Sequence, residues 1–168
     1  RAVLCLEVAD RLLYSGGSDA LIKIWDLDKK TCVSTLTGHT GDVNVLRLFD
    51  DRLFSGSSDT YVKVWDVWSR QCLATVREHK LGVLSIVRIG SILYTGGVDS
   101  EIKVFDLDRG IIPPLTAEDA PSDEEDEYAM RMSVGALEGS LFYVTQLSGH
   151  ANAIYAMDFD GEKLVSAG

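Results

Sequence analysis

The sequence predicts an all-β fold made of a repeated four-stranded antiparallel sheet. The first observation is a motif that recurs at a constant spacing, as SGGSDALIKIWDLD (15–28), SGSSDTYVKVWDVW (55–68) and TGGVDSEIKVFDLD (95–108). The second is that each repeat contains four short segments rich in β-branched and aromatic residues, separated by polar turns. The third is that no segment keeps the 3.6-residue period of an amphipathic helix.

The four strands can be justified in order along the second repeat. Residues 43–49 (VNVLRLF) are β-branched and apolar, and residues 52–56 (RLFSG) follow an Asp-Asp turn signal. Residues 61–67 (YVKVWDV) alternate in polarity, and residues 72–76 (CLATV) form the last short apolar run. One such sheet cannot bury both of its faces, so we expect the repeats to stack on one another.

Single positions also align at the 40-residue offset, which indicates internal duplication. Each repeat carries Gly, Asp, Lys, a large aromatic residue and a second Asp at matching places: Gly16, Gly56 and Gly96; Asp19, Asp59 and Asp99; Lys23, Lys63 and Lys103; Trp25, Trp65 and Phe105; Asp26, Asp66 and Asp106. The glycine pairs 16–17 and 96–97 lack the spacing of a phosphate-binding loop. We therefore expect them to provide positive φ at turns.

A 40-residue, four-strand repeat that ends in Trp-Asp resembles the WD-repeat β-propeller family. The residues that match its signature are Trp25-Asp26, Gly38-His39 with Trp65-Asp66, Glu78-His79 with Phe105-Asp106, and Gly149-His150. Glu78 in place of Gly and Phe105 in place of Trp depart from it. The resemblance implies four-stranded blades arranged around a central channel.

By this resemblance the blades lie at about 1–37, 38–77, 78–148 (with an insert at about 110–140) and 149–168, the last being incomplete. Closed propellers have about 4 to 8 blades. We therefore expect part of a propeller, an open arc of blades, from a longer protein.

Composition limits the function. The 168 residues carry a net charge of -10, which argues against nucleic acid and against an anionic membrane surface as partners. Cys5, Cys32 and Cys72 lie far apart and without a histidine cluster, so we expect no metal, no disulfide and three mostly buried thiols. Reduced cysteines predict an intracellular protein, cytoplasmic or nuclear, and we expect no cofactor.

His39, Ser55 and Asp59 are the residue types of a hydrolase triad. The same spacing returns as His79, Thr95 and Asp99, and again begins as His150 and Ser166, and an active site is not duplicated once per repeat. The family resemblance implies instead a hydrogen-bonded chain Trp65–Ser55–His39–Asp59 that stabilises each blade. The first repeat has its partial equivalent in Ser15, Asp19 and Trp25.

An insert interrupts the third repeat. His79 follows His39 by one repeat period, whereas His150 follows His79 only after a much longer stretch of chain. The additional residues include all three prolines and seven acidic residues between Glu118 and Glu127. This composition predicts a disordered loop. The loop is either a solubilising spacer or a docking segment for a basic partner. Ser122, followed by Asp-Glu-Glu, resembles an acidophilic phosphorylation site.

The leading functional hypothesis is a non-catalytic scaffold that binds other proteins or peptides through its loops. By family resemblance the candidate contact residues on one face are Thr40, Asp42, Asn44, Ser58, Lys80, Leu81, Val98 and Asn152. Trp68 is a separate candidate, because it stands in a turn where the other repeats have Asp28 and Asp108.

The alternative is the substrate-recognition subunit of a ubiquitin ligase. One version of the family docks a ligase adaptor through an Arg two positions after the Asp of Trp-Asp. Asp28, Trp68 and Asp108 occupy those positions here, so these repeats do not support that version.

Overall fold

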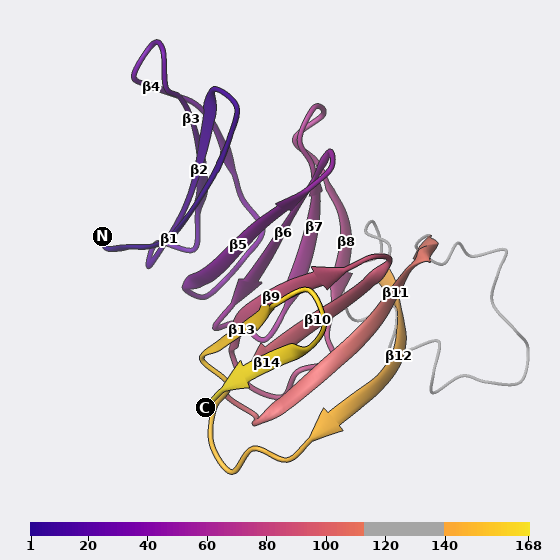
Figure 1. Cartoon of the computed structure of the whole chain (residues 1–168). Coiled ribbons are helices and arrows are strands. Elements are labelled where there is room, and N and C mark those ends of the chain that lie inside the picture. The colour runs from indigo at the N-terminus through magenta and orange to yellow at the C-terminus, as the bar shows by residue number, and fades with distance from the viewer. Residues whose placement is uncertain (113–139) are drawn as a thin grey trace, which may run out of the picture.

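The computed structural model describes residues 1–112 and 140–168, and in these residues all regular structure is β-strand. The strands form three four-stranded antiparallel sheets and one hairpin (Figure 1). The first sheet contains β1 (Val3–Ala9), β2 (Leu12–Gly17), β3 (Ile22–Asp26) and β4 (Thr31–Leu36). The second contains β5 (Val43–Phe49), β6 (Arg52–Ser57), β7 (Val62–Asp66) and β8 (Cys72–Val76).

The third sheet contains β9 (Val83–Ile89), β10 (Ile92–Gly97), β11 (Glu101–Ile112) and β12 (Ser140–Ser148). The hairpin pairs β13 (Ala156–Phe159) with β14 (Leu164–Ala167). The first strands of successive sheets lie side by side, so the sheets fan out as an open arc (Figure 1). The prediction of a partial, all-β propeller of antiparallel sheets is confirmed.

The same strand register repeats in each sheet, because the turns repeat. Ser15 pairs with Lys23, Ser55 with Lys63 and Thr95 with Lys103. Positive φ angles also recur at the 40-residue offset, at Asp10, Asp50 and Gly90, at Ala20, Thr60 and Ser100, and at Lys30, Arg70 and Gly110. Tight hairpin turns require such angles, which match the right-handed twist of the flanking strands.

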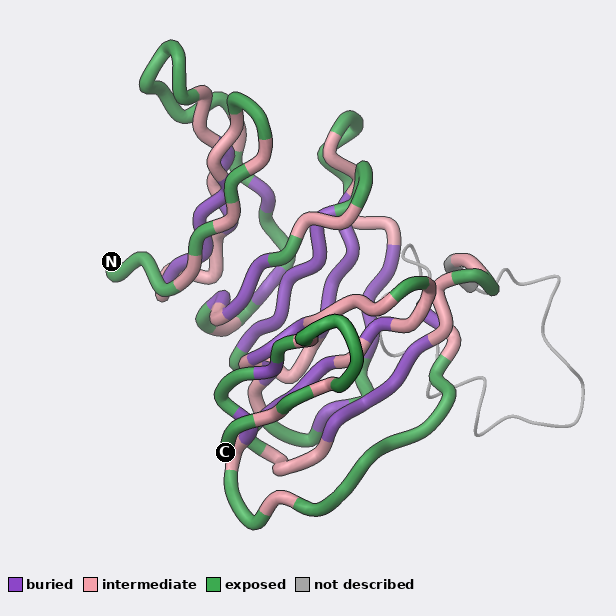
Figure 2. Tube along the Cα trace, in the orientation of Figure 1, coloured by how far each residue is buried: buried purple, intermediate pink, exposed green. Residues whose placement is uncertain are grey.

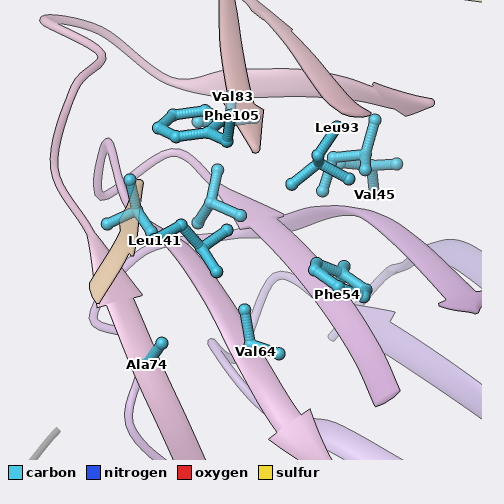
Figure 3. Close-up of a cluster of buried hydrophobic side chains, with 11 residues drawn as sticks. Val45, Phe54, Val64, Ala74, Val83, Leu93, Phe105 and Leu141 are labelled. Atoms are coloured by element: carbon cyan, nitrogen blue, oxygen red, sulfur yellow. The ribbon is translucent and has the colours of Figure 1, made fainter. Parts of the chain in front are cut away.

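The hydrophobic core lies between the sheets. Tyr14 and Ile24 of the first sheet pack with Leu46 and Trp65 of the second in one cluster. A second cluster joins the second and third sheets through residues that include Phe54, Val83 and Phe105 (Figure 3). Ile154 and Met157 pack with Ile102 in a third cluster that joins the hairpin to the third sheet. Burial is accordingly concentrated in the strands of the second and third sheets (Figure 2).

The strand-end glycines do not have the positive φ that we expected of 16–17 and 96–97. A Cβ on Gly16 would lie 2.6 Å from Val43 of the next sheet. A Cβ on Gly56 would lie 2.7 Å from Val83, and one on Gly96 would lie 2.9 Å from Ile154. The missing side chain therefore lets the next sheet approach closely, which is why Gly recurs there.

The two ends of the arc differ. On β1 the side chains of Val3, Leu6 and Val8 are all more than half exposed. At the hairpin end, Ile154 and Met157 are buried against the third sheet. Tyr155, which precedes β13, is 68% exposed.

The insert is bracketed by β11 and β12, whose last pair is Ile112 with Ser140. Leu141 is buried in the cluster that includes Ala74, because β12 lies beside β8 of the second sheet. Residues 113–139 lie outside the described part of the chain. The predictions of a disordered acidic loop and of a phosphorylation site at Ser122 therefore lie outside it too.

The prediction of mostly buried thiols is wrong for one of the three cysteines. Cys5 and Cys72 are half-buried, whereas Cys32 is exposed. Cys32 lies on β4 of the first sheet, most of which is exposed, whereas Cys72 packs against the cluster between the first and second sheets.

Candidate functional site

The polar residues that resemble a triad come from four places in and beside the second sheet. His39 lies in the loop that enters the sheet, Ser55 lies on β6, Asp59 lies in the β6–β7 turn, and Trp65 lies on β7. Ser55 precedes Gly56 at the end of β6, and its partner across the strands is Lys63. The hairpin thus brings Ser55 and Trp65 to the position where the entering loop places His39.

These four side chains form one continuous hydrogen-bonded chain. The Trp65 indole N–H donates to Ser55 Oγ at 2.8 Å, and Ser55 Oγ lies 2.7 Å from His39 Nε2. His39 Nδ1 lies 2.7 Å from Asp59 Oδ2. A neutral histidine satisfies every link when Nδ1–H donates to the carboxylate and Nε2 accepts the serine hydroxyl.

Asp59 is the electrostatic anchor of this chain. Burial by itself would raise the pKa of Asp59, but the hydrogen bond and electrostatic interaction with His39 and the N–H groups of Thr40 and Tyr61 lower it to about 2. The ionised carboxylate accepts from Thr40 N at 2.9 Å and from Tyr61 N at 3.0 Å. It therefore fixes both the entering loop and the β6–β7 turn.

The third sheet repeats the arrangement with one link fewer. His79 Nε2 lies 2.8 Å from Thr95 Oγ1, and Nδ1 lies 3.0 Å from both oxygens of Asp99. Burial lowers the pKa of His79, although Asp99 opposes this. Burial would raise the pKa of Asp99, but the Lys80 N–H and His79 lower it. Phe105 stands in the place of Trp65 and is fully buried without a polar group.

The other two repeats contain partial versions. In the first sheet the Trp25 indole donates to Ser15 Oγ at 2.9 Å, and Asp19 accepts from Leu21 N at 3.3 Å. Beside the hairpin, His150 Nε2 lies 2.7 Å from Ser166 Oγ. The four versions thus share geometry and differ in which members are present.

Their burial is unlike that of a nucleophile. Ser55 is 0% exposed, and its hydroxyl is enclosed by the indole and the imidazole. A nucleophilic serine oxygen must be reached by the substrate carbonyl, whereas Ser55 has no exposed surface. Burial also raises the pKa of the Cys5 thiol to about 11, which keeps it in the protonated form.

We call the surface that carries the candidate contact residues the loop face. Some of these residues are exposed, and others already form hydrogen bonds within the protein. Thr40, Asp42, Ser58, Lys80 and Asn152 are exposed. Asn44 is only half-exposed, because its amide donates to Ser58 Oγ at 3.1 Å and to the Val83 carbonyl at 3.0 Å. Asn44 therefore ties the second sheet to the third and has little hydrogen-bonding capacity left for a partner.

Leu81 and Val98 form the apolar part of this face. Leu81 is 50% exposed and Val98 is 41% exposed. The Val98 N–H donates to the Gly82 carbonyl at 2.8 Å, which holds the two loops next to each other. The equivalent positions in the second repeat are Gly41 and Ser58, so this apolar pair is specific to the third repeat.

The sequence analysis missed the role of the recurring lysines. Lys63 is buried, and its Nζ donates to Thr75 Oγ1 at 2.7 Å. Lys103 is buried too, and its Nζ contacts Glu101 at 2.5 Å and Gln146 at 2.6 Å. Their recurrence at the 40-residue offset was the available signal. In the second and third sheets these lysines link the third strand to the fourth.

Within residues 1–112 and 140–168 no three His, Cys, Asp or Glu side chains gather in a way that could hold a metal ion. Over the same residues the structure has no helix that is both long enough and apolar enough to cross a membrane.

Comparison with known proteins agrees with this architecture. The family model of WD40, the WD domain, G-beta repeat, matches residues 1–26, 30–66 and 70–106. Solved structures are similar over nearly the whole chain. The computationally designed Ika4 protein has a TM-score of 0.71 at 24% identity, covering 98% of this chain and 84% of that one. The U3-55K structure has a TM-score of 0.74 at 22% identity, covering 99% and 45%.

Curated relatives match over single repeats. The probable E3 ubiquitin ligase complex SCF subunit sconB of Emericella nidulans is 40% identical over 38 residues, which are 23% of this chain and 6% of that protein. The F-box/WD repeat-containing protein sel-10 of Caenorhabditis elegans is 39% identical over 41 residues, 24% and 7% respectively. The matched part is therefore a small fraction of either relative.

Proposed function

Since the chain belongs to the WD40 (WD domain, G-beta repeat) family, we propose that it is a non-catalytic scaffold that binds other proteins or peptides. The observation that carries this is the exposed Leu81–Val98 pair on the loop face. Exposed apolar side chains on rigidly held loops are typical of protein contact sites, because their burial by a partner is favourable and little loop entropy is lost.

The internal hydrogen bonds support the non-catalytic role. The Ser, His and Asp side chains that could perform hydrolysis are already used to hold loops and strands together. These side chains hold the loop face in place. The Lys80 N–H donates to Asp99 Oδ2 at 2.9 Å, directly beside Leu81. The polar chain thus orders the surface on which a partner would bind.

The chemistry of this face suggests a partner segment with an apolar side chain next to a carboxylate. Leu81 and Val98 would cover the apolar group, and the exposed ammonium of Lys80 would attract the acid. With a net charge of -10 on the chain, we propose protein partners and neither nucleic acid nor a membrane surface. An intracellular location, and a basic partner for the acidic residues 118–127, belong to the same proposal.

The test exchanges the apolar pair for the residues of the second repeat. Peptides are selected from a random displayed library on the wild-type chain, and their Kd is measured by fluorescence anisotropy. In a Leu81→Gly, Val98→Ser double variant we expect at least tenfold weaker binding with an unchanged Tm. Selected peptides should carry an apolar residue beside Asp or Glu. Equal affinity for the double variant would reject the loop face as the binding site.

A second candidate function is substrate recognition for a ubiquitin ligase. Its support is the match of single repeats to SCF and F-box/WD proteins. If it applies, adding the chain to an extract that conjugates ubiquitin should change the ubiquitination of a protein that binds the loop face. The Leu81→Gly, Val98→Ser variant should have no such effect. An identical response to both chains, or to neither, would reject it.

A further inference from the structure

Trp68 stands apart from the other two tryptophans of the chain. Trp65 is buried and donates to Ser55, and Trp25 is half-buried and donates to Ser15. Trp68 is 78% exposed and lies in the β7–β8 turn, which projects beyond the sheet at the end opposite the loop face (Figure 1). Exposing so large an apolar side chain costs free energy, which its burial by a partner would recover.

The turn itself does not need a tryptophan. In the first two repeats an Asp carboxylate caps this turn: Asp26 accepts from Lys29 N at 2.8 Å, and Asp66 accepts from Trp68 N at 3.1 Å. In the third repeat Asp106 accepts from Asp108 N at 2.9 Å in the same way, although β11 continues past this point to Ile112. The positive φ also recurs, at Lys30, Arg70 and Gly110. The same turn therefore forms in the first repeat with Asp28 in the place of Trp68, and the Asp cap of the third repeat forms with Asp108 at that position. Neither the turn conformation nor core packing accounts for the indole.

The turn holds the indole on a rigid base. Asp66 Oδ1 also accepts from Ser69 N at 2.6 Å, and the Arg70 N–H donates to the Asp66 carbonyl at 2.9 Å. These bonds hold the Asp66 pKa below its usual range, the Ser69 N–H contributing most. The Val67 N–H donates to the Asp51 carbonyl at 3.2 Å, which ties this turn to the β5–β6 turn. An aromatic side chain on a fixed backbone loses little entropy on binding.

Two arginines near this turn suggest the chemistry of the partner that Trp68 contacts: Arg70 lies in the turn, and Arg52 pairs across the strands with Asp66, whose carboxylate caps the turn. Arg52 and Arg70 are exposed, and Arg70 reaches the Val33 carbonyl only at 3.5 Å. Within the described part of the chain no salt bridge involves either arginine. Carboxylates of a partner could therefore pair with both guanidinium groups while the indole is buried. Trp and Arg are also the residues most enriched among interface hot spots.

We propose that Trp68, with Arg52 and Arg70, is a second docking site, separate from the loop face. Its occupant is a folded protein that has an apolar pocket with carboxylates at its rim. Because the turn projects from the protein, Trp68 would insert into a pocket of the partner. A projecting turn does not form a groove that could hold a peptide. The chain would then hold two proteins at opposite ends of its strands.

The test begins with a photo-crosslinking residue, p-benzoylphenylalanine, at position 68 of the chain and, as the matched control, at position 28. A protein of a cell extract that is crosslinked only from position 68 is purified and used as the probe in titration calorimetry. Trp68→Asp installs the residue of the equivalent turn of the first repeat, so its Tm should be unchanged. We expect its Kd for the probe to rise at least tenfold. Leu81→Gly, Val98→Ser should leave the Kd within twofold.

Three results would overturn the proposal. One is an equal Kd for wild type and Trp68→Asp. Another is crosslinking of position 68 to a second copy of the chain, with self-association lost in Trp68→Asp by sedimentation. The third is binding to phosphatidylcholine vesicles that disappears in Trp68→Asp, which would assign the indole to a lipid surface. Failure of the loop-face variant to affect its own peptides would reject the proposed function and leave this site standing.

Discussion

At the level of single residues, Asp59 shows how the repeated polar motif stabilises the fold. Its carboxylate accepts from His39, from the backbone of the loop that His39 belongs to, and from the following strand. In the described part of the chain every fully buried side-chain nitrogen and oxygen has a partner, so these bonds replace those lost to water. Burial therefore accounts for the hydrogen bonds among these residue types.

Asp59 should make the stability depend on pH in acid. Its folded pKa of about 2 lies below the roughly 3.9 of an unfolded Asp. Its contribution is therefore complete above about pH 5 and is lost as the pH falls toward 2, amounting to about 2 kcal/mol. Urea unfolding of wild type and Asp59→Asn from pH 6 to pH 2.5 measures it. The difference between the two free energies of unfolding should shrink as the pH falls, and parallel curves would contradict this.

At the level of the element, turn conformation and strand spacing each impose a residue requirement. Thr60 occupies the β6–β7 turn with φ of 79°, in a region that β-branched residues rarely adopt. Gly56 ends the preceding strand, and a Cβ there would lie 2.7 Å from both Val45 and Val83. The turn thus tolerates Thr60, although its φ is unfavourable for a β-branched residue. The packing around Gly56, by contrast, leaves no room for a side chain.

Thr60→Gly should stabilise the chain. Glycine adopts positive φ without the steric cost that Thr incurs, which is worth up to about 1 kcal/mol after the added flexibility of the unfolded chain is subtracted. Thermal unfolding should show a higher Tm. Thr31→Gly, on an exposed strand, is the control and should lower the Tm. A Tm for Thr60→Gly at or below that of wild type would show that the turn does not strain Thr60.

Gly56→Ala should destabilise the chain by about 1–3 kcal/mol, because the new methyl group forces the second and third sheets apart. A double-mutant cycle with Val83→Ala tests the contact, since the smaller residue makes space for the methyl group. We expect a coupling energy on the order of 1 kcal/mol that favours the double variant. Gly149→Ala, with no atom within 4 Å of its Cβ, is the control. If the effects of the two substitutions were additive, the destabilisation by Gly56→Ala would not arise from contact with Val83.

At the level of the whole molecule, one packing arrangement is used between every pair of neighbouring sheets. Val43, Val83 and Ile154 each enter the space left by a glycine of the preceding sheet. The outer face of the first sheet has no such neighbour, so Val3, Leu6 and Val8 are exposed on β1. An apolar sheet face of this kind promotes association.

The isolated 168-residue chain should therefore self-associate through the first sheet. Sedimentation velocity should show a concentration-dependent rise in mass. Leu6→Lys with Val8→Lys should shift the chain toward monomer without lowering its Tm, because both side chains are exposed. Tyr155→Lys, at the other end of the arc, is the matched variant. A wild-type chain that stays monomeric at 100 µM would contradict the expectation.

Much of the fold could be predicted because the chain repeats itself. The 40-residue period, the turn residues and the alternation of residues 61–67 specify strand number and order within each sheet, since these depend on local sequence. The same repetition indicated that His39, Ser55, Asp59 and Trp65 recur as a structural unit. Comparison of repeats also singled out Trp68, because a difference within a duplicated turn is visible without coordinates.

Tertiary structure alone decided which faces are covered. The sequence pattern could not tell that Gly16 and Gly96 serve close approach of the next sheet and not positive φ, because both roles select glycine. It could not tell that Ile154 and Met157 are buried while Tyr155 is exposed, that Cys32 is exposed, or that Asn44 bridges two sheets. Those outcomes depend on contacts between residues far apart in the chain. Local sequence specifies each sheet, and the neighbouring sheet determines which of its side chains remain free to bind.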